Sequence, residues 1–260
     1  MGKIIAVANQ KGGVGKTTTV INLAGALGEK GKKVLIIDID PQGNTTSGLG
    51  INKKENTLST YNLLIGDAGI DKAIVHTKFK SLDLVPSNMS LAGVEVELVE
   101  LSERTYRLRQ AIAPAKEAYD YIFIDCPPSL GLITLNALAA ANTLLVPIQC
   151  EYYALEGLTQ LMATVRQVKR MYNPDIGIEG VLLTMFDSRL NLTLQVVNEV
   201  KRYFPDQVYK TVIPRNVRLS EAPSYGEPIQ YYDRFSKGAQ AYEDLAKEFL
   251  KVQRKKKGVH

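Results

Sequence analysis

Short runs of apolar, often β-branched residues constrain the fold of this chain more than any other feature. Residues 34–37 and 122–124 are apolar at every position, which is typical of strands covered on both faces of a sheet. Longer segments with helical spacing of apolar residues, such as 18–30 and 154–171, lie between these runs. This alternation predicts an α/β fold with a doubly wound, mostly parallel sheet flanked by helices.

The same patterns locate the individual elements. We predict strands at residues 3–8, 33–38, 82–86, 121–125, 144–148, 180–185 and 208–213, and helices at 18–30, 154–171, 192–203 and 239–252. The segment 51–108 is more polar and helical, and we expect it to decorate one edge of the sheet. No internal repeat or low-complexity linker divides the chain. We therefore expect residues 1–252 to form one domain and the basic residues 253–260 to form a flexible tail.

Composition and charge exclude several classes of protein. The 45% hydrophobic and 23% charged content of the 260 residues is ordinary for a soluble globular protein. No stretch approaches the roughly 20 apolar residues that cross a bilayer, and the N-terminus carries no signal-peptide pattern, so we expect a cytoplasmic protein. Cys126 and Cys150 are too few for a disulfide framework and lack metal-ligand spacing; we expect buried thiols. The net charge of +5 is compatible with nucleic acid or an anionic membrane as a partner.

The segment between the first predicted strand and the first predicted helix carries the most specific motif. It reads Gln10-Lys11-Gly12-Gly13-Val14-Gly15-Lys16-Thr17-Thr18. Glycines let backbone N–H groups turn toward a triphosphate, and the following helix N-terminus adds a favourable dipole potential. Lys16 is expected to reach the β- and γ-phosphates of ATP, and the hydroxyl of Thr17 to coordinate Mg²⁺. A Rossmann dinucleotide site is the natural rival, but it does not require the Lys16-Thr17 pair.

Two acidic segments follow predicted strands. They are Asp38-Ile39-Asp40-Pro41-Gln42-Gly43-Asn44 and Asp125-Cys126-Pro127-Pro128-Ser129. Ligands of doubly wound sheets bind beyond the carboxyl ends of the strands, so we expect these carboxylates to face the γ-phosphate and the metal. Asp40 is the candidate for positioning or activating the attacking water. Asp38 and Asp125 are predicted to hold Mg²⁺ through water, and the prolines to stiffen a loop that senses the γ-phosphate.

Together these motifs resemble those of the ParA/Soj family of chromosome- and plasmid-partitioning ATPases. The general pattern G-x-x-x-x-G-K-[ST] asks for glycine where this chain has Gln10, and Lys11 follows at once. The result is K-G-G-x-G-K-[ST], the form of the deviant Walker A members. The resemblance continues through residues 149–157 and 212–224 and covers nearly the whole chain. Since the chain starts a few residues before the loop, it is similar to the short members without an N-terminal helix-turn-helix domain.

The resemblance implies a switch. In this family, ATP closes a homodimer, the dimer binds double-stranded DNA without sequence preference, and a ParB-type partner stimulates slow ATP hydrolysis and release. Lys11 would reach the phosphates of the partner subunit, and a side chain at Gly12 would block closure because the subunits approach there. The resemblance also implies that Pro214 and Asn216 frame and hydrogen-bond the adenine, with Met185 and Phe186 nearby.

Basic residues in the C-terminal half are the candidates for DNA contacts. They are Arg189, Arg215, Arg218, Arg234, Lys237 and Lys247. Arg189 and Arg218 are the first choices for phosphate contacts. Dimerisation would double this surface, so contacts that are weak in one subunit give useful affinity only in the ATP state. We accordingly expect a nucleoid-associated protein.

Two other functions remain open. MinD-like ATPases share the loop and the dimer but bind membranes through a C-terminal amphipathic helix; here Tyr242, Leu245, Ala246 and Phe249 form one apolar face, which either docks on the core or lies on a membrane surface. The segment 213–224 favours the ParA interpretation. An iron–sulfur electron carrier of the nitrogenase-iron-protein type needs two cysteines per subunit at the dimer axis, and no cysteine upstream of Cys126 can serve as the second ligand.

Overall fold

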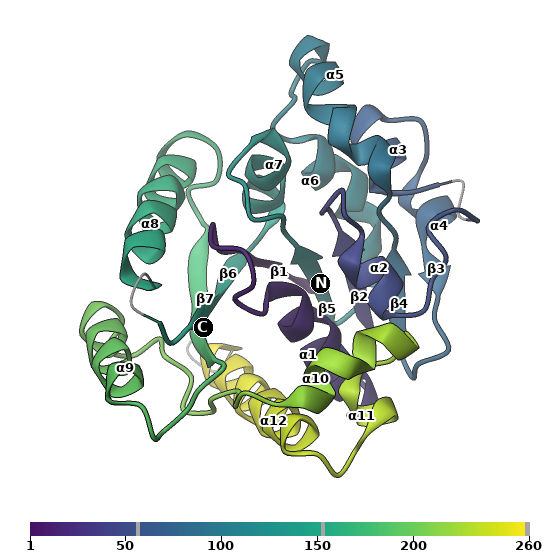
Figure 1. Ribbon diagram of the computed structural model, residues 1–260. Coiled ribbons are helices and arrows are strands. Elements are labelled where there is room, and N and C mark those ends of the chain that lie inside the picture. Colours follow the sequence, from purple (N-terminus) through teal and green to yellow (C-terminus); the bar gives the residue numbers. More distant parts are fainter. Residues whose placement is uncertain (56–57, 152–153, 258–260) are drawn as a thin grey trace.

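The computed structural model describes residues 1–55, 58–151 and 154–257 (Figure 1). Its strands are β1 (Lys3–Val7), β2 (Val34–Asp38), β3 (Val75–His76), β4 (Leu82–Val85), β5 (Tyr121–Asp125), β6 (Thr143–Gln149) and β7 (Gly177–Thr184). They form a 7-stranded sheet in the order β3-β4-β2-β5-β1-β6-β7. All neighbours are parallel except β3 and β4 at the edge. The predicted doubly wound, mostly parallel sheet is confirmed.

Helices flank both faces of this sheet. They are α1 (Lys16–Glu29), α2 (Asn44–Gly48), α3 (Thr60–Ile65), α4 (Ile70–Ala73), α5 (Val94–Glu100), α6 (Arg107–Ile112), α7 (Leu132–Ala140), α8 (Ala154–Met171), α9 (Asn191–Tyr203), α10 (Val217–Glu221), α11 (Ile229–Tyr232) and α12 (Lys237–Lys257). The short 3₁₀ turns are η1 (Met89–Gly93), η2 (Ala113–Glu117) and η3 (Ala222–Tyr225). Helices predicted at 18–30, 154–171, 192–203 and 239–252 are present as α1, α8, α9 and α12.

Two hydrophobic clusters, one on each face of the sheet, form the core. Successive residues of β1 alternate between them: Ile4 and Ala6 pack with residues of α3 and α5–α9, whereas Ile5 and Val7 pack with residues of α1 and α12. This period of two is the geometry of a strand buried on both faces. In Figure 1, α1 and α10–α12 lie on one side of the sheet and α3 and α5–α7 on the other.

The apolar face of α12 docks on this core. Tyr242, Leu245, Ala246 and Phe249 are all 0% exposed, and the Phe249 ring contacts that of Tyr121 on β5. A face buried in this way is not available to a membrane surface. Among the described helices, none is long and apolar enough to span a bilayer.

The segment 208–213 is not a strand, contrary to the sequence-based prediction. Single bridges at Val208 and Pro214 connect it to the neighbourhood of β7. Between them, the backbone amides of Lys210 and Thr211 donate to the carboxylate of Glu248 on α12, at 2.8 and 2.9 Å. Because these amides are satisfied by a side chain, they do not continue the ladder of the sheet.

The C-terminal end also differs from expectation. α12 continues to Lys257, so residues 253–257 are helical where the sequence predicted the start of a flexible tail. The reason is Gln253, which is 6% exposed and hydrogen-bonds to both Lys3 and the buried Glu179. Residues 258–260, the rest of the predicted tail, lie outside the described residues. Cys126 and Cys150 are buried free thiols, as predicted.

Candidate nucleotide-binding site

The loop between β1 and α1 depends on glycine at two left-handed positions. Gly13 has φ 73° and Gly15 has φ 84°, a region that residues with a Cβ rarely enter. Gly15 is also the N-cap of α1, and its carbonyl accepts from the Thr19 amide at 2.9 Å. Thr184 at the end of β7 donates its hydroxyl to the carbonyl of Val14 at 2.9 Å. The positive end of the α1 dipole is therefore directed at the loop, which suits an anion.

The side chain of Lys16, the first residue of α1, points back to this loop. It is 7% exposed, and its ammonium group donates to the carbonyl of Lys11 at 3.3 Å. Burial lowers the pKa of Lys16 below its ordinary value, against the opposing effect of the Asp125 charge. Among the residues that the structure describes, this buried ammonium group has one long hydrogen bond and no anionic partner in direct contact, and a triphosphate in the loop would provide such partners.

Asp125 and Thr17 form the centre of the site. Asp125 Oδ2 accepts hydrogen bonds from the hydroxyls of Thr17, at 2.8 Å, and Thr45, at 2.7 Å. Its other oxygen, Oδ1, is buried and has no hydrogen-bond partner among the described residues. Burial raises the pKa of Asp125 to about 6, although the two threonine hydrogen bonds oppose this. An unpartnered carboxylate oxygen beside a threonine hydroxyl fits a hydrated Mg²⁺ ion, which takes one or two carboxylates plus substrate phosphates.

Asp38 lies beside Asp125 because the two residues are paired in the register of β2 and β5. Its Oδ2 accepts from the amide and hydroxyl of Thr46, at 2.9 and 2.7 Å, and its Oδ1 from the amide of Asp40, at 3.2 Å. Burial and the charge of Asp125 raise the pKa of Asp38 to about 7. Asp38 thus fixes the loop that carries Asp40, and a cation between the two carboxylates would relieve their repulsion.

Asp40 lies on the wall of a cavity of about 690 Å³ that is also lined by the phosphate loop. Its carboxylate accepts from the amide of Gln42 at 2.9 Å, and its carbonyl accepts from the hydroxyl of Ser87 at 2.7 Å. Pro128, in the loop after Asp125, lines the same cavity. The cavity therefore brings together the predicted loop, the predicted water-positioning carboxylate and one of the predicted prolines.

A second cavity, of about 470 Å³, adjoins the first. It is lined by Gly15, Thr18, Thr184, Met185, Ile213, Pro214, Arg215, Asn216, Leu219, Ser220, Pro223 and Tyr242. Gly15, Thr18 and Met185 line both cavities. Met185 holds a left-handed backbone, φ 49°, which costs a residue with a side chain about 1–3 kcal/mol and is common at ligand sites. Because the two cavities share these walls, we call them together the trough.

Within the second cavity, Asn216 caps α10 by accepting from the Leu219 amide at 3.3 Å. Its side-chain amide nitrogen remains a donor for a ligand. Phe186 is not among the described residues that line the cavity. Its backbone instead holds the wall in place, because its amide donates to Ile213 at 3.0 Å and its carbonyl accepts from Arg215 at 3.4 Å.

Lys11 and Gly12 lie at the outer rim of the loop. The Lys11 ammonium group pairs with Glu151 Oε2 at 2.9 Å, and both side chains are partly exposed. Gly12 is exposed, and a Cβ built on it meets no described atom within 4 Å. Within one chain, therefore, none of the described residues requires glycine at position 12 on steric grounds.

The predicted DNA-contacting residues are spread over several elements, and half of them are ion-paired. Arg189 pairs with Asp187 at 2.6 Å, Lys247 with Asp244 at 2.9 Å, and Arg218 with both Glu221 and Asp233. Among the described residues, no ion pair involves the other members, Arg215, Arg234 and Lys237. Arg215 lines the second cavity, and Arg234 lies over the ring of Phe235.

Sequence reasoning missed several residues of the site. Thr45 and Thr46 hold the two aspartates, Ser87 holds the backbone of Asp40, and Tyr242 of α12 lines the second cavity. Thr45 and Thr46 directly follow the acidic segment 38–44, which is the one signal that pointed to them. Nothing in the local sequence marks Ser87, and Tyr242 was identified only as part of the apolar face of the last helix; both reach the site through long-range packing.

Comparisons with known proteins agree with this geometry. Residues 2–178 match the model of a family described as AAA domain. The chain is 59% identical over 248 residues to the sporulation initiation inhibitor protein Soj of Bacillus subtilis (strain 168), covering 95% of this chain and 98% of that protein. It is 54% identical to the chromosome partitioning protein ParA of Myxococcus xanthus (strain DK1622), covering 96% and 89% of the two chains. The chain belongs to the Soj/ParA family.

This Soj/ParA protein is also similar to a solved structure with a bound nucleotide analogue. Cobyrinic acid a,c-diamide synthase from Mycobacterium smegmatis, with a bound ATP analogue and magnesium, superposes with a TM-score of 0.86 at 38% sequence identity. The match covers 98% of this chain and 96% of the other. The identity to Soj and ParA over 95% and 96% of this chain confirms the resemblance that the motifs implied.

Proposed function

We propose that this Soj/ParA protein is an ATPase that acts as a dimerising switch in DNA segregation. The observation that carries the proposal is the trough, in which the cavity lined by Lys16, Thr17 and Asp40 adjoins a second cavity bounded by Pro214 and Asn216. The buried, unpartnered oxygen of Asp125 lies behind Thr17, which hydrogen-bonds to the other oxygen of the same carboxylate. The size and polarity of the trough suit a triphosphate at one end and an adenine base at the other. The related structure with a bound ATP analogue and magnesium supports the same ligands here.

ATP binding would be governed by the loop. In the proposal, backbone amides of Gly12–Thr18 surround the phosphates, Lys16 contacts the β- and γ-phosphates, and Met185, Pro214 and Asn216 frame the base. Thr17 and Asp125 would hold Mg²⁺, with Asp38 supporting it through water. When bound, the metal neutralises charge on the phosphates. Asp40, on the wall of the phosphate cavity, would orient or activate the water that attacks the γ-phosphate.

Dimerisation would use the exposed rim of the loop. Lys11 must leave Glu151 to contact a partner's phosphates, and a partly exposed ion pair of this kind contributes only about 0–1 kcal/mol. A densely charged triphosphate offers stronger, charge-assisted hydrogen bonds. No residue in the described part of the chain crowds a Cβ at Gly12, which supports the prediction that its small size serves the contact between subunits.

DNA binding would follow from dimerisation. The six basic residues Arg189, Arg215, Arg218, Arg234, Lys237 and Lys247 are spread over the C-terminal half, and closure of two subunits doubles them. Binding through phosphates is independent of sequence and falls steeply with salt. In the proposal, a ParB-type partner stimulates hydrolysis, after which the dimer opens and leaves the nucleoid.

Light scattering coupled to size exclusion tests the switch. Asp40→Ala, which blocks hydrolysis in this scheme, should be a dimer with Mg-ATP and a monomer with ADP. Gly12→Val should bind ATP and stay monomeric. Gly93→Val is the matched control, because a Cβ at Gly93 also meets no described atom within 4 Å and Gly93, in η1, lines neither cavity of the trough; it should dimerise normally. An ATP-saturated Asp40→Ala protein that remains monomeric would refute the proposal.

A second measurement separates DNA from membrane binding. ATP-loaded protein should bind an arbitrary duplex in fluorescence anisotropy, with affinity that falls as salt rises. It should not co-sediment with anionic vesicles, because the apolar face of α12 is buried. Vesicle binding without DNA binding would favour the MinD-like alternative.

A further inference from the structure

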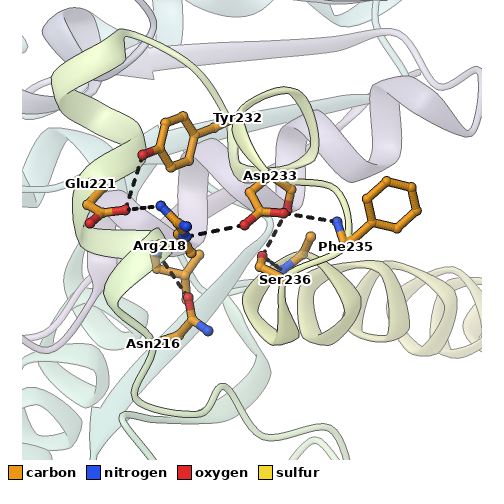
Figure 2. Close-up of polar contacts among 9 residues, drawn as sticks. Asn216, Arg218, Glu221, Tyr232, Asp233, Phe235 and Ser236 are labelled. Atoms are coloured by element: carbon orange, nitrogen blue, oxygen red, sulfur yellow. Dashed lines mark hydrogen bonds and ion pairs between the residues drawn. The ribbon is translucent and has the colours of Figure 1, made fainter.

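The turn between α11 and α12 presents a fully exposed aromatic side chain. Phe235 is 92% exposed, and Figure 2 shows its ring directed away from the polar residues around it. The guanidinium group of Arg234 lies 5.7 Å from the ring centroid, and Lys237 follows at the start of α12. A single exposed apolar residue is ordinary; what distinguishes Phe235 is the ordered turn that carries it and the cations beside it.

Asp233 and Ser236 build that turn. The carboxylate of Asp233 accepts from the Phe235 amide at 3.3 Å, and its carbonyl accepts from the Ser236 amide at 3.1 Å and hydroxyl at 2.8 Å. The Ser236 hydroxyl then accepts from the Ala239 amide at 3.1 Å, which caps α12. Phe235 is therefore held out by a short, hydrogen-bonded turn rather than by a loose loop.

Arg218 links this turn to α10. Its Nη1 donates to Glu221 at 2.9 Å and its Nε lies 3.3 Å from Asp233 Oδ2, while the hydroxyl of Tyr232 donates to Glu221 at 3.1 Å (Figure 2). Two carboxylates thus share one guanidinium group and more than offset its charge. Such an arginine would attract a DNA phosphate only weakly. The planar, forked guanidinium group of Arg218 is instead suited to hold α10 and the turn before α12 together.

We propose that Arg218 is a positioning residue, and that the turn it holds inserts Phe235 against duplex DNA. Apolar side chains contact the duplex by wedging partly between base steps, which is independent of salt and tolerant of sequence. Arg234 and Lys237, on either side of Phe235 and its neighbour Ser236, would contact the phosphates on both sides of the wedge. The proposal rests on the DNA binding proposed above and reassigns Arg218 from a phosphate contact to a bridge.

The Arg218 bridge also links the turn that carries Phe235 to the proposed nucleotide-binding cavity. α10 begins next to Asn216, which lines the second cavity, and carries Arg218 and Glu221. A shift of this short helix on nucleotide binding would therefore be passed through Arg218 to Asp233 and the turn. A membrane is the less suitable surface for Phe235, because one ring next to the carboxylate of Asp233 lacks the broad apolar face that interfacial anchoring needs.

Charge-changing variants separate a bridge from a phosphate contact. Asp233→Asn removes a negative charge but keeps an acceptor for the Phe235 amide. If Arg218 contacts phosphate, this change frees it and DNA binding strengthens. If Arg218 is a bridge, the turn loosens and binding weakens, on the order of three- to tenfold. Arg218→Lys, which keeps the charge and loses the fork geometry of the guanidinium group, should weaken DNA binding as well.

Phe235→Ala tests the wedge itself. It should weaken DNA binding on the order of tenfold at every salt concentration, with an unchanged salt slope.

The measurement is fluorescence anisotropy of a labelled arbitrary duplex with the full chain and a non-hydrolysable ATP analogue, from low to high salt. Light scattering must show normal dimers for each variant, which separates a local effect from misfolding. Tighter binding by Asp233→Asn, or unchanged binding by Phe235→Ala, would overturn the inference while leaving the switch intact. Phe235-dependent binding to vesicles containing phosphatidylglycerol, in place of DNA, would overturn it too. Absence of wild-type DNA binding would instead defeat the proposed function.

Discussion

Replacing Gln253 by alanine should destabilise the whole domain, because this residue closes α12 over a buried carboxylate. Glu179 on β7 is 4% exposed. It pairs with Lys3 at 2.5 Å and accepts from the Thr143 hydroxyl at 2.7 Å. The Gln253 amide donates to its remaining oxygen, and the Gln253 carbonyl accepts from Lys3 at 2.8 Å. Gln253 therefore makes two charge-assisted hydrogen bonds at the end of a helix that packs on β5 and α1.

The magnitude follows from these contacts. Burial raises the pKa of Glu179, but the charge and hydrogen bond of Lys3 and the hydrogen bond of Thr143 outweigh it, so the pKa lies below its ordinary value. A carboxylate with a lowered pKa contributes stability above its unfolded-state pKa and loses it as the pH falls through the folded value. At neutral pH the network is intact, and loss of the Gln253 bonds should cost about 2 kcal/mol.

Urea unfolding followed by circular dichroism measures this loss. With a slope of about 3 kcal/mol/M, Gln253→Ala should lower the unfolding midpoint by about 0.7 M. Lys256→Ala is the matched control: its ammonium group lies 3.5 Å from the same carboxylate, but its side chain is 46% exposed, so it should cost at most about 1 kcal/mol. If Gln253→Ala unfolds at the wild-type midpoint, the end of α12 is not anchored and residues 253–257 behave as the flexible tail that the sequence predicted.

Four further outcomes are expected. Lys16→Ala should weaken ATP binding by about 100-fold or more in calorimetry, since the γ-phosphate loses its buried cation. Asp40→Ala should slow phosphate release by about 10²–10⁴-fold in a steady-state ATPase assay and accumulate ATP-bound dimer; normal turnover would remove Asp40 from its role. Arg189→Ala should leave dimerisation intact and reduce the salt slope of DNA binding by about 1. Because the pKa of Asp125 is raised to about 6, Mg²⁺ must displace a proton at acidic pH. Mg-dependent nucleotide affinity should therefore fall from pH 8 to pH 5.5, and calorimetry in buffers of different ionisation enthalpy should detect the released proton.

Local sequence was sufficient wherever neighbours in the chain decide the structure. Gly13 and Gly15 of the loop have positive φ where the motif needs it, and the continuous apolar runs are strands buried on both faces. Asp38 and Asp125 were both placed at strand ends from sequence, and the parallel pairing of β2 with β5 then brings them side by side. Such features are predictable because parallel strands end at the same edge of the sheet, so residues at the carboxyl ends of neighbouring strands meet there.

Long-range side-chain contacts set the limit of sequence-based prediction. The segment 208–213 has the composition of a strand, but Glu248, far along the chain, takes up its amides. Gln253 stands next to a run of basic residues typical of a tail, yet its partner Glu179 lies 74 residues earlier. Arg218 has a neighbouring carboxylate three residues on, in Glu221, but only the folded chain reveals the second one, Asp233, that makes it a bridge. In each case the deciding partner is invisible to periodicity or motif spacing.

Helix α12 contacts all of these distant parts of the chain. Its 21 residues span about 30 Å at 1.5 Å per residue. Its C-terminal end is anchored by Gln253, and its middle by Glu248 and the buried Phe249. Tyr242, nearer its start, lines the second cavity and approaches the hydroxyl of Thr19 on α1 at 3.3 Å. Its first turn, by contrast, is held by Ser236 and the Arg218 bridge at the surface. A packed helix end moves less than a surface turn. When nucleotide binds, we therefore expect the turn that carries Phe235 to move and the C-terminal end of α12 to stay in place.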